Sequence, residues 1–423
     1  MKIQLPFYLS IAYIVLLFLQ IPVIAGGGVL AADVGFIALA VSLLPQWRPR
    51  SRNMLSDRGL FWLVAFLGLA TLATLLHGGI YNLAVFAYMA AIYIVFSEPM
   101  LNQREAFFLG MFLLGTLLAA YCVAWVWRFF SANPACDAAG LFYIDRYLTP
   151  DRHGILGARF QCLFNNPNLL GSFYILPVAL CFGTLKAKVM PRLTTLPRLL
   201  LALAATLVIL LPLLSTVSKH AVATFALAAL LFAEAPVLKN WRPRLLGWAV
   251  ILAFGLVAIL TTTYRISPVR SQFPFINTSL PANYAIHRAI YAKICVNSAM
   301  GALFGHSPEE LHRLYPTFAD RTLIAKVMES YGSEPLVEPF STFMDPHIEY
   351  LNLPAFFGIP AMLCWLAFWL SRIFQGGISR NEAAMFVVAI LLCCCWDDLM
   401  SKRWVWTAAA IFFANKQTRN CSS

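Results

Sequence analysis

The sequence predicts an all-α polytopic membrane protein of about twelve transmembrane helices, from its composition, its apolar runs and the placement of its basic residues. Of the 423 residues, 60% are hydrophobic and only 12% are charged, and the mean hydropathy is +0.73. Soluble domains are usually roughly 45–50% apolar and about 25% charged. We therefore expect lipid to form part of the solvent around this chain.

A membrane span needs about 20 mostly apolar residues. The N-terminal run resembles a signal peptide, but it is long and no cleavage site precedes the next apolar stretch, so we interpret it as the first span. No linker to a soluble domain is visible, and residues 1–423 are predicted to form a single transmembrane domain. The predicted spans are 5–25, 28–45, 60–76, 81–96, 106–129, 169–185, 199–214, 220–236, 245–263, 347–371, 383–396 and 404–414.

Basic residues recur in every second loop between the predicted spans. If the N-terminus lies in the cytoplasm, these loops are the cytoplasmic ones, which is the positive-inside pattern. The net charge of +12 is therefore scattered over short loops, and this distribution argues against a nucleic-acid-binding surface. The predicted cytoplasmic cations are Arg48, Arg50, Arg52, Arg58, Arg104, Lys186, Lys188, Arg192, Arg198, Lys239, Arg242, Arg244, Arg372, Arg380, Lys416 and Arg419.

Two segments on the opposite side are too long to be turns. They are residues 130–168 and, between the ninth and tenth spans, a large periplasmic insert of residues 264–346. The insert has helical signals of its own at 283–300 and 321–331. In the run Ser-Pro-Glu-Glu at 307–310, a serine N-cap and a proline at the first helical position predict a further helix start.

Three cations on the outer side are candidate anion-binding residues. Lys219 lies in a short turn between two apolar spans, Arg265 follows the ninth span directly, and Arg288 lies within the predicted insert helix. Arginine can hold phosphate oxygens through two parallel charge-assisted hydrogen bonds. Taken singly, each of these residues is equally compatible with a snorkelling side chain or a structural salt bridge.

His347 is the candidate general base. Asp345 as N-cap and Pro346 as first helical residue predict that His347 lies in the first turn of the tenth span, at the outer surface. The helix dipole there disfavours imidazolium, whereas neighbouring carboxylates favour it, so a neutral imidazole that accepts a proton is plausible. An isolated interfacial histidine also fits a purely structural role.

Metal chemistry is not expected, because no histidine or cysteine spacing marks a metal site. The run of three cysteines at 393–395 fits small apolar packing within a span. Cys136 and Cys162, the two cysteines of the 130–168 loop, would face an oxidising compartment and are predicted to pair as a disulfide.

Four stretches in order along the chain resemble the O-antigen ligase family, which belongs to a superfamily shared with polymerases of lipid-linked polysaccharide units. Residues 164–168, Phe-Asn-Asn-Pro-Asn, precede a span as the family's N-P-N segment does. Residues 214–221 match the family's S-R-G/A turn, with Lys219 where an arginine is usual. This replacement keeps the charge but loses the bidentate fork.

The other two stretches flank the insert. Arg288 matches the arginine on the helix that opens the family's large outer loop, and residues 303–306, Leu-Phe-Gly-His, resemble a weakened F-G-x-G motif. His347, with a glycine-containing apolar helix after it, matches the histidine that closes the loop.

The resemblance implies a GT-C-like glycosyltransferase that needs no metal or other cofactor. Such an enzyme would transfer a glycan from undecaprenyl diphosphate to a sugar hydroxyl of the lipid A core, with inversion, at the periplasmic face of a Gram-negative inner membrane. His347 and Arg288 are then the expected catalytic residues. The expected substrate-binding residues are Lys219, Arg265, Arg159, Arg152 and Asn168.

Two other functions stay open at this point. A polymerase of lipid-linked repeat units would have a similar donor site and would differ in its acceptor. A transporter or flippase of lipid-linked sugars is expected to carry charged residues at mid-membrane and inverted repeats. The clear intramembrane carboxylates here are only Asp33 and Glu234, both near span ends, so this class fits less well.

Overall fold

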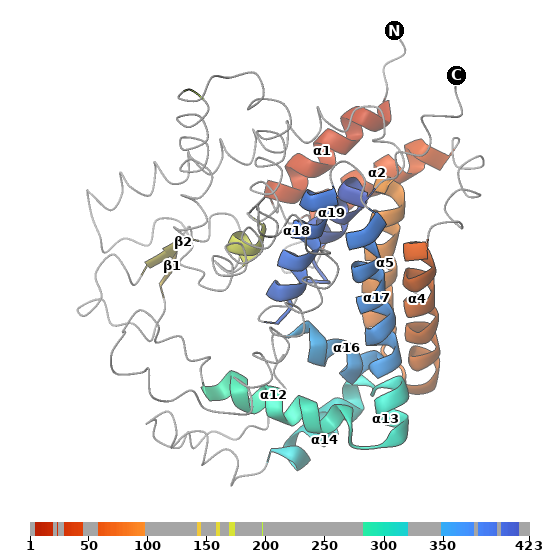
Figure 1. The fold of residues 1–423 in the computed structure, drawn as a ribbon, viewed down its shortest axis with the longest axis vertical. Coiled ribbons are helices and arrows are strands. Elements are labelled where there is room, and N and C mark those ends of the chain that lie inside the picture. The colour runs from red at the N-terminus through yellow and green to blue at the C-terminus, as the bar shows by residue number, and fades with distance from the viewer. Residues whose placement is uncertain are drawn as a thin grey trace, which may run out of the picture.

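The computed structural model describes residues 5–19, 23, 29–44, 58–97, 142–144, 158–160, 169–173, 197, 282–319, 348–375, 380–395 and 399–413. This part of the chain is predominantly helical (Figure 1). Its helices are α1 Leu5–Leu19, α2 Ala31–Leu43, α4 Arg58–His77, α5 Ile80–Ser97, α12 Ala282–Cys295, α13 Ala299–Phe304, α14 Pro308–Phe318, α16 Glu349–Phe357, α17 Ile359–Gln375, α18 Arg380–Cys393 and α19 Arg403–Phe413. Two short strands, β1 Phe142–Ile144 and β2 Ala158–Phe160, pair antiparallel with Tyr143 opposite Arg159.

The apolar runs predicted at both ends of the chain are helices. Within the described residues, one helix is long and apolar enough to cross a membrane, Gly59–His77. Shorter apolar helices lie at Leu5–Leu17, Ala31–Leu43, Ile80–Phe96 and Ile359–Arg372. The helical class is confirmed, and the number of about twelve spans stays a prediction.

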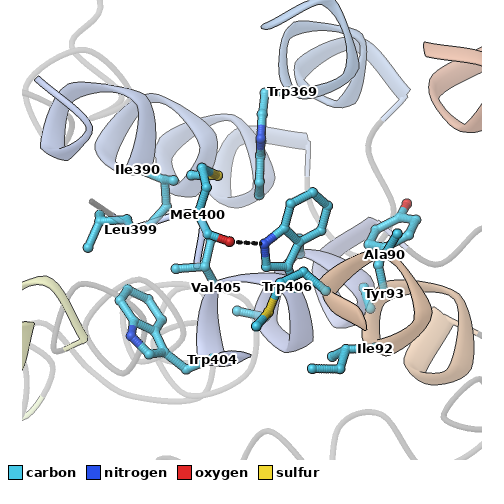
Figure 2. Close-up of a cluster of buried hydrophobic side chains, with 14 of the residues drawn as sticks. Ala90, Ile92, Tyr93, Trp369, Ile390, Leu399, Met400, Trp404, Val405 and Trp406 are labelled. Carbon is cyan, nitrogen blue, oxygen red and sulfur yellow. Dashed lines mark hydrogen bonds between the residues drawn. The ribbon is translucent and has the colours of Figure 1, made fainter. Parts of the chain in front are cut away.

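These helices pack as a bundle around one apolar core. α4 lies along α17, α1 packs on α2, and α5 packs on α19 (Figure 1). Aromatic rings fill the centre of the core: Trp406 lies 5.7 Å from Trp369 and 5.8 Å from Phe368 between ring centroids. The Trp406 indole N–H donates a 2.7 Å hydrogen bond to the Met400 carbonyl, so its polar group is satisfied inside this cluster (Figure 2).

The helices α12, α13 and α14 lie together at one end of the bundle, which we call the insert end (Figure 1). Their small core contains Ile290, Ile294, Leu311 and Tyr315, and it also takes in Ala355 of α16. The predicted helix start at residue 307 is confirmed, because the Ser307 hydroxyl accepts a 3.0 Å hydrogen bond from the Glu310 N–H. The predicted helix at 321–331 lies outside the described residues.

Two predictions about helix continuity are wrong. The helix expected over 283–300 ends at Cys295, and α13 begins at Ala299 after its own N-cap, Ser298. The tenth span, expected as one helix over 347–371, is broken at Gly358 between α16 and α17. Gly358 has φ +85°, a left-handed conformation that ends a helix and that glycine adopts without strain.

The predicted start of the tenth span at Asp345 and Pro346 is also wrong. α16 begins at Glu349, and its N-cap Ile348 has extended backbone, with φ −148° and ψ 116°. The reason is tertiary, because the Glu349 N–H donates a 3.0 Å hydrogen bond to the carbonyl of Cys394, at the end of α18. His347 therefore precedes the helix instead of lying in its first turn, and its own placement is outside the described residues.

Two glycines join the insert to the bundle by direct backbone contact. Gly305, with φ +74°, lies against the backbone of Phe356 and Phe357, and Gly358 lies against the backbone of Leu303 and Phe304. Beside this contact, the His306 N–H donates a 2.8 Å hydrogen bond to the Ala355 carbonyl. A Cβ at either glycine would overlap these backbone atoms, so both positions require glycine.

We predict that Gly358→Ala and Gly305→Ala each destabilise the protein by several kcal/mol, because a left-handed non-glycine residue alone costs about 1–3 kcal/mol and the overlap adds to it. Thermal unfolding in detergent, followed by size-exclusion chromatography, measures the loss. Gly68→Ala in α4 is the matched control, since a Cβ there has no atom within 4 Å. Equal melting temperatures for Gly358→Ala and Gly68→Ala would mean that the backbone contact does not form.

Candidate functional site

Arg288 is buried where the insert meets the bundle. Its side chain is 1% exposed and projects from α12, whose residues Ile290, Tyr291 and Ile294 form the insert core. α12 also packs against α16. A guanidinium cannot lose its charge at physiological pH, so burying it fixes a permanent positive charge at this place.

The end of α18 completes the surroundings of Arg288. The Cys395 thiol lies within electrostatic range of Arg288. Glu349, whose N–H bonds to the Cys394 carbonyl, is also 1% exposed. An arginine and a carboxylate are thus both buried beside residues 394–395, at a place we call the α12–α16–α18 junction.

This junction brings Arg288 to the part of the chain that follows His347. The described chain resumes at Ile348, the residue directly after His347, and Ile348 is itself buried here. Arg288 and Ile348 are separated by about 60 residues of sequence, yet α12 and the start of α16 pack together. The helix that carries Arg288 therefore packs against the helix that begins just after His347 in the sequence.

The remaining predicted site residues are only partly placed. Arg159 lies in β2 opposite Tyr143, and its backbone alone is described. α12, which carries Arg288, packs mainly on α16, α14 and α13, whereas β2 pairs with β1. Lys219, Arg265, Arg152, Asn168 and the cysteines Cys136 and Cys162 lie outside the described residues.

Two histidines of the insert, His287 and His306, are buried and make contacts with other residues of the insert. His306 is 4% exposed, with Nε2 3.2 Å from the Ile294 carbonyl and Nδ1 3.1 Å from a Glu310 carboxylate oxygen. The ring of His287 stacks on Tyr315, and its Nδ1 is hydrogen-bonded to the tyrosine hydroxyl. Among the described residues, no group of three or more His, Cys, Asp or Glu side chains could hold a metal ion.

The cysteines of the described region are also structural. Burial raises the pKa of the Cys295 thiol to about 12, so this insert thiol stays protonated and unreactive at neutral pH. Cys393, Cys394 and Cys395 are at most 2% exposed, which confirms their predicted packing role.

Sequence reasoning missed an ion pair that joins α2, near the start of the chain, to α19, near its end. Asp33 of α2 receives two bonds from the guanidinium of Arg403, at 2.5 Å and 2.8 Å, and a third of 2.6 Å from the Tyr88 hydroxyl. The predicted spans 28–45 and 404–414 put Asp33 near the start of the second span and Arg403 directly before the twelfth, so both charges are expected near the outer ends of spans. The opposite signs and the similar expected depth could have indicated this pair. It was missed because the two residues are 370 positions apart in the sequence.

Comparison with family models, with curated proteins and with solved structures finds no match to this chain. The resemblance to O-antigen ligases therefore rests on the four sequence stretches alone. The geometry of the α12–α16–α18 junction is an independent observation beside it.

Proposed function

We propose that this protein is an O-antigen ligase of a Gram-negative inner membrane, a multi-pass membrane glycosyltransferase of about twelve spans. It transfers a glycan from undecaprenyl diphosphate to a sugar hydroxyl of the lipid A core at the periplasmic face. The observation that carries the proposal is the buried Arg288 of α12, a helix that packs against α16, whose N-cap Ile348 directly follows His347. These are the two residues to which the sequence resemblance assigns the chemistry.

The two ends of the bundle support this orientation. Gly78 and Gly79 form the turn between α4 and α5, and Gly79 faces Pro308 of the insert. At the opposite end, Arg372 lies against Gly59 and over the rings of Tyr93 and Phe368. Arg372 is therefore buried on α17 instead of solvated in a loop, but it still lies at the end of the bundle that the charge rule assigns to the cytoplasm.

Arg288 supplies the charge that the reaction requires. When the acceptor hydroxyl attacks the anomeric carbon, the bond to the diphosphate breaks and negative charge grows on the departing oxygen. A fixed guanidinium in a dry site stabilises that charge far more than an exposed one would. Lys219 and Arg265 are proposed to contact the same diphosphate, and Arg159, Arg152 and Asn168 to contact the donor from the 130–168 loop.

His347 is proposed as the general base. It would accept the proton of the acceptor hydroxyl as that oxygen bonds to the anomeric carbon, on the face opposite the leaving diphosphate, which inverts the configuration. Glu349 is two residues further along the chain and is held beside residue 394. A negative charge on its carboxylate would favour the imidazolium that forms during the step. In this scheme the diphosphate charge is met by arginine and lysine and no metal or other cofactor is used.

We predict that His347→Ala lowers transfer by about 10²–10⁴-fold, the usual contribution of a general base, at unchanged membrane levels. The variant is expressed in a strain that lacks the native copy, and its lipopolysaccharide is resolved by electrophoresis. The long ladder should be lost while lipid-linked glycan accumulates. His312→Ala is the control, because His312 is an exposed residue of α14.

Two outcomes would contradict this prediction. A normal ladder from His347→Ala would remove the histidine from the mechanism. A product that carries a single repeat unit would identify a polymerase, because chain extension would have failed while transfer to the lipid A core continued.

The second prediction concerns the donor diphosphate. Arg288→Ala should impair transfer more than Arg288→Lys, which keeps a charge but loses the bidentate fork. Lys219→Arg should be tolerated or should improve transfer. The measurement is the transfer rate against donor concentration in proteoliposomes, at matched folded protein, with Arg313→Ala as control because that side chain is 78% exposed. Parent-like rates for Arg288→Ala would exclude Arg288 from donor use.

A further inference from the structure

The corner between α12 and α13 exposes three large apolar side chains. Val296, Met300 and Leu303 are 66%, 51% and 49% exposed. They lie on the outward side of the insert, since the other side of this segment, at Gly301 and Gly305, is buried against His306 and α16. A soluble loop domain gains nothing from keeping such side chains in water.

The position of this corner along the bundle sets its depth in a membrane. The apolar part of α4, Gly59–His77, contains 19 residues and is therefore about 28 Å long, close to the roughly 30 Å of a bilayer's hydrocarbon core. Its last residue thus lies near the membrane surface. α13 packs against α4, and Gly79, two residues beyond this end, faces Pro308 of α14. With α4 across the bilayer as proposed above, the α12–α13 corner lies at the level where hydrocarbon meets headgroups.

The end of the bundle on which α13 packs also exposes large apolar side chains. The end of α4 and the start of α5 expose Leu75, Leu76 and Ile80 by 79%, 50% and 77%. Only 33% of the α4 span is buried inside the protein, so most of its surface is available to lipid. The exposed Lys293 lies three residues before Val296. A cation beside an apolar face is typical of segments that lie in the membrane surface.

We propose that the α12–α13 corner is embedded in the membrane surface, with Val296, Met300 and Leu303 in contact with phospholipid acyl chains. This contact is separate from the glycosyl transfer proposed above and shares with it only the placement of α4 across the bilayer. It holds the insert at a fixed depth, so the α12–α16–α18 junction stays close to the membrane surface, where a lipid-linked substrate presents its diphosphate.

The test is site-specific photocrosslinking of the full-length protein in phospholipid vesicles. A benzophenone amino acid replaces Met300 or Leu303, and irradiated protein is digested and searched for phospholipid adducts by mass spectrometry. Leu75, on α4, is the positive control, and the exposed Arg313 of α14 is the aqueous control. We expect phospholipid adducts at Met300, Leu303 and Leu75, and none at Arg313.

The controls separate this inference from the membrane placement itself. Adducts at Leu75 without adducts at Met300 and Leu303 would overturn the lipid contact of the corner. Peptide adducts at Met300 or Leu303 would overturn it too, because they would mean that protein covers this surface. Absence of adducts at Leu75 as well would overturn the membrane placement of α4 and the lipid contact with it. None of these outcomes depends on transferase activity.

Discussion

The reciprocal contact of Gly305 and Gly358 is the constraint on which the arrangement of the insert depends. Each glycine adopts a left-handed conformation, and each lies against the backbone of the other segment. Side chains are excluded from the contact, so the two segments approach as closely as two main chains can. The position of the insert is set by this contact together with the bond from the His306 N–H to the Ala355 carbonyl.

The proposed chemistry and the proposed lipid contact both follow from this docking. With α13 fixed against the break between α16 and α17, α12 packs on α16 and its buried Arg288 lies within electrostatic range of Cys395, just after α18. The same docking turns Val296, Met300 and Leu303 outward, at the end of α4. The docking of α13 thus fixes the position of the buried Arg288 on one side of the insert and of the exposed apolar α12–α13 corner on the other.

Much of the helical framework was predictable from local sequence. The apolar runs gave the helices near both ends of the chain, and the Ser-Pro-Glu-Glu run gave the start of α14, because a cap needs only neighbouring residues. The break at Gly358 was not predicted, since a lone glycine in an apolar run is often tolerated within a helix. The start of α16 was placed three residues too early, because its true start is fixed by a bond to Cys394, distant in sequence. The candidate site shows the same difference. Arg288 was found by its helix and its charge, whereas its burial within electrostatic range of Cys395 required the fold.

The docking of the insert is tested most directly by amide hydrogen exchange of the unmodified protein, read by mass spectrometry. A six-residue helix such as α13 is too short to be stable alone. If the insert docks as described, amides of α13 and His306 should exchange slowly, at rates like those of α16, while the exposed part of α14 around His312 and Arg313 exchanges faster. Exchange of residues 299–306 as fast as that of an unstructured loop would contradict the docking and the placement of Arg288 that depends on it.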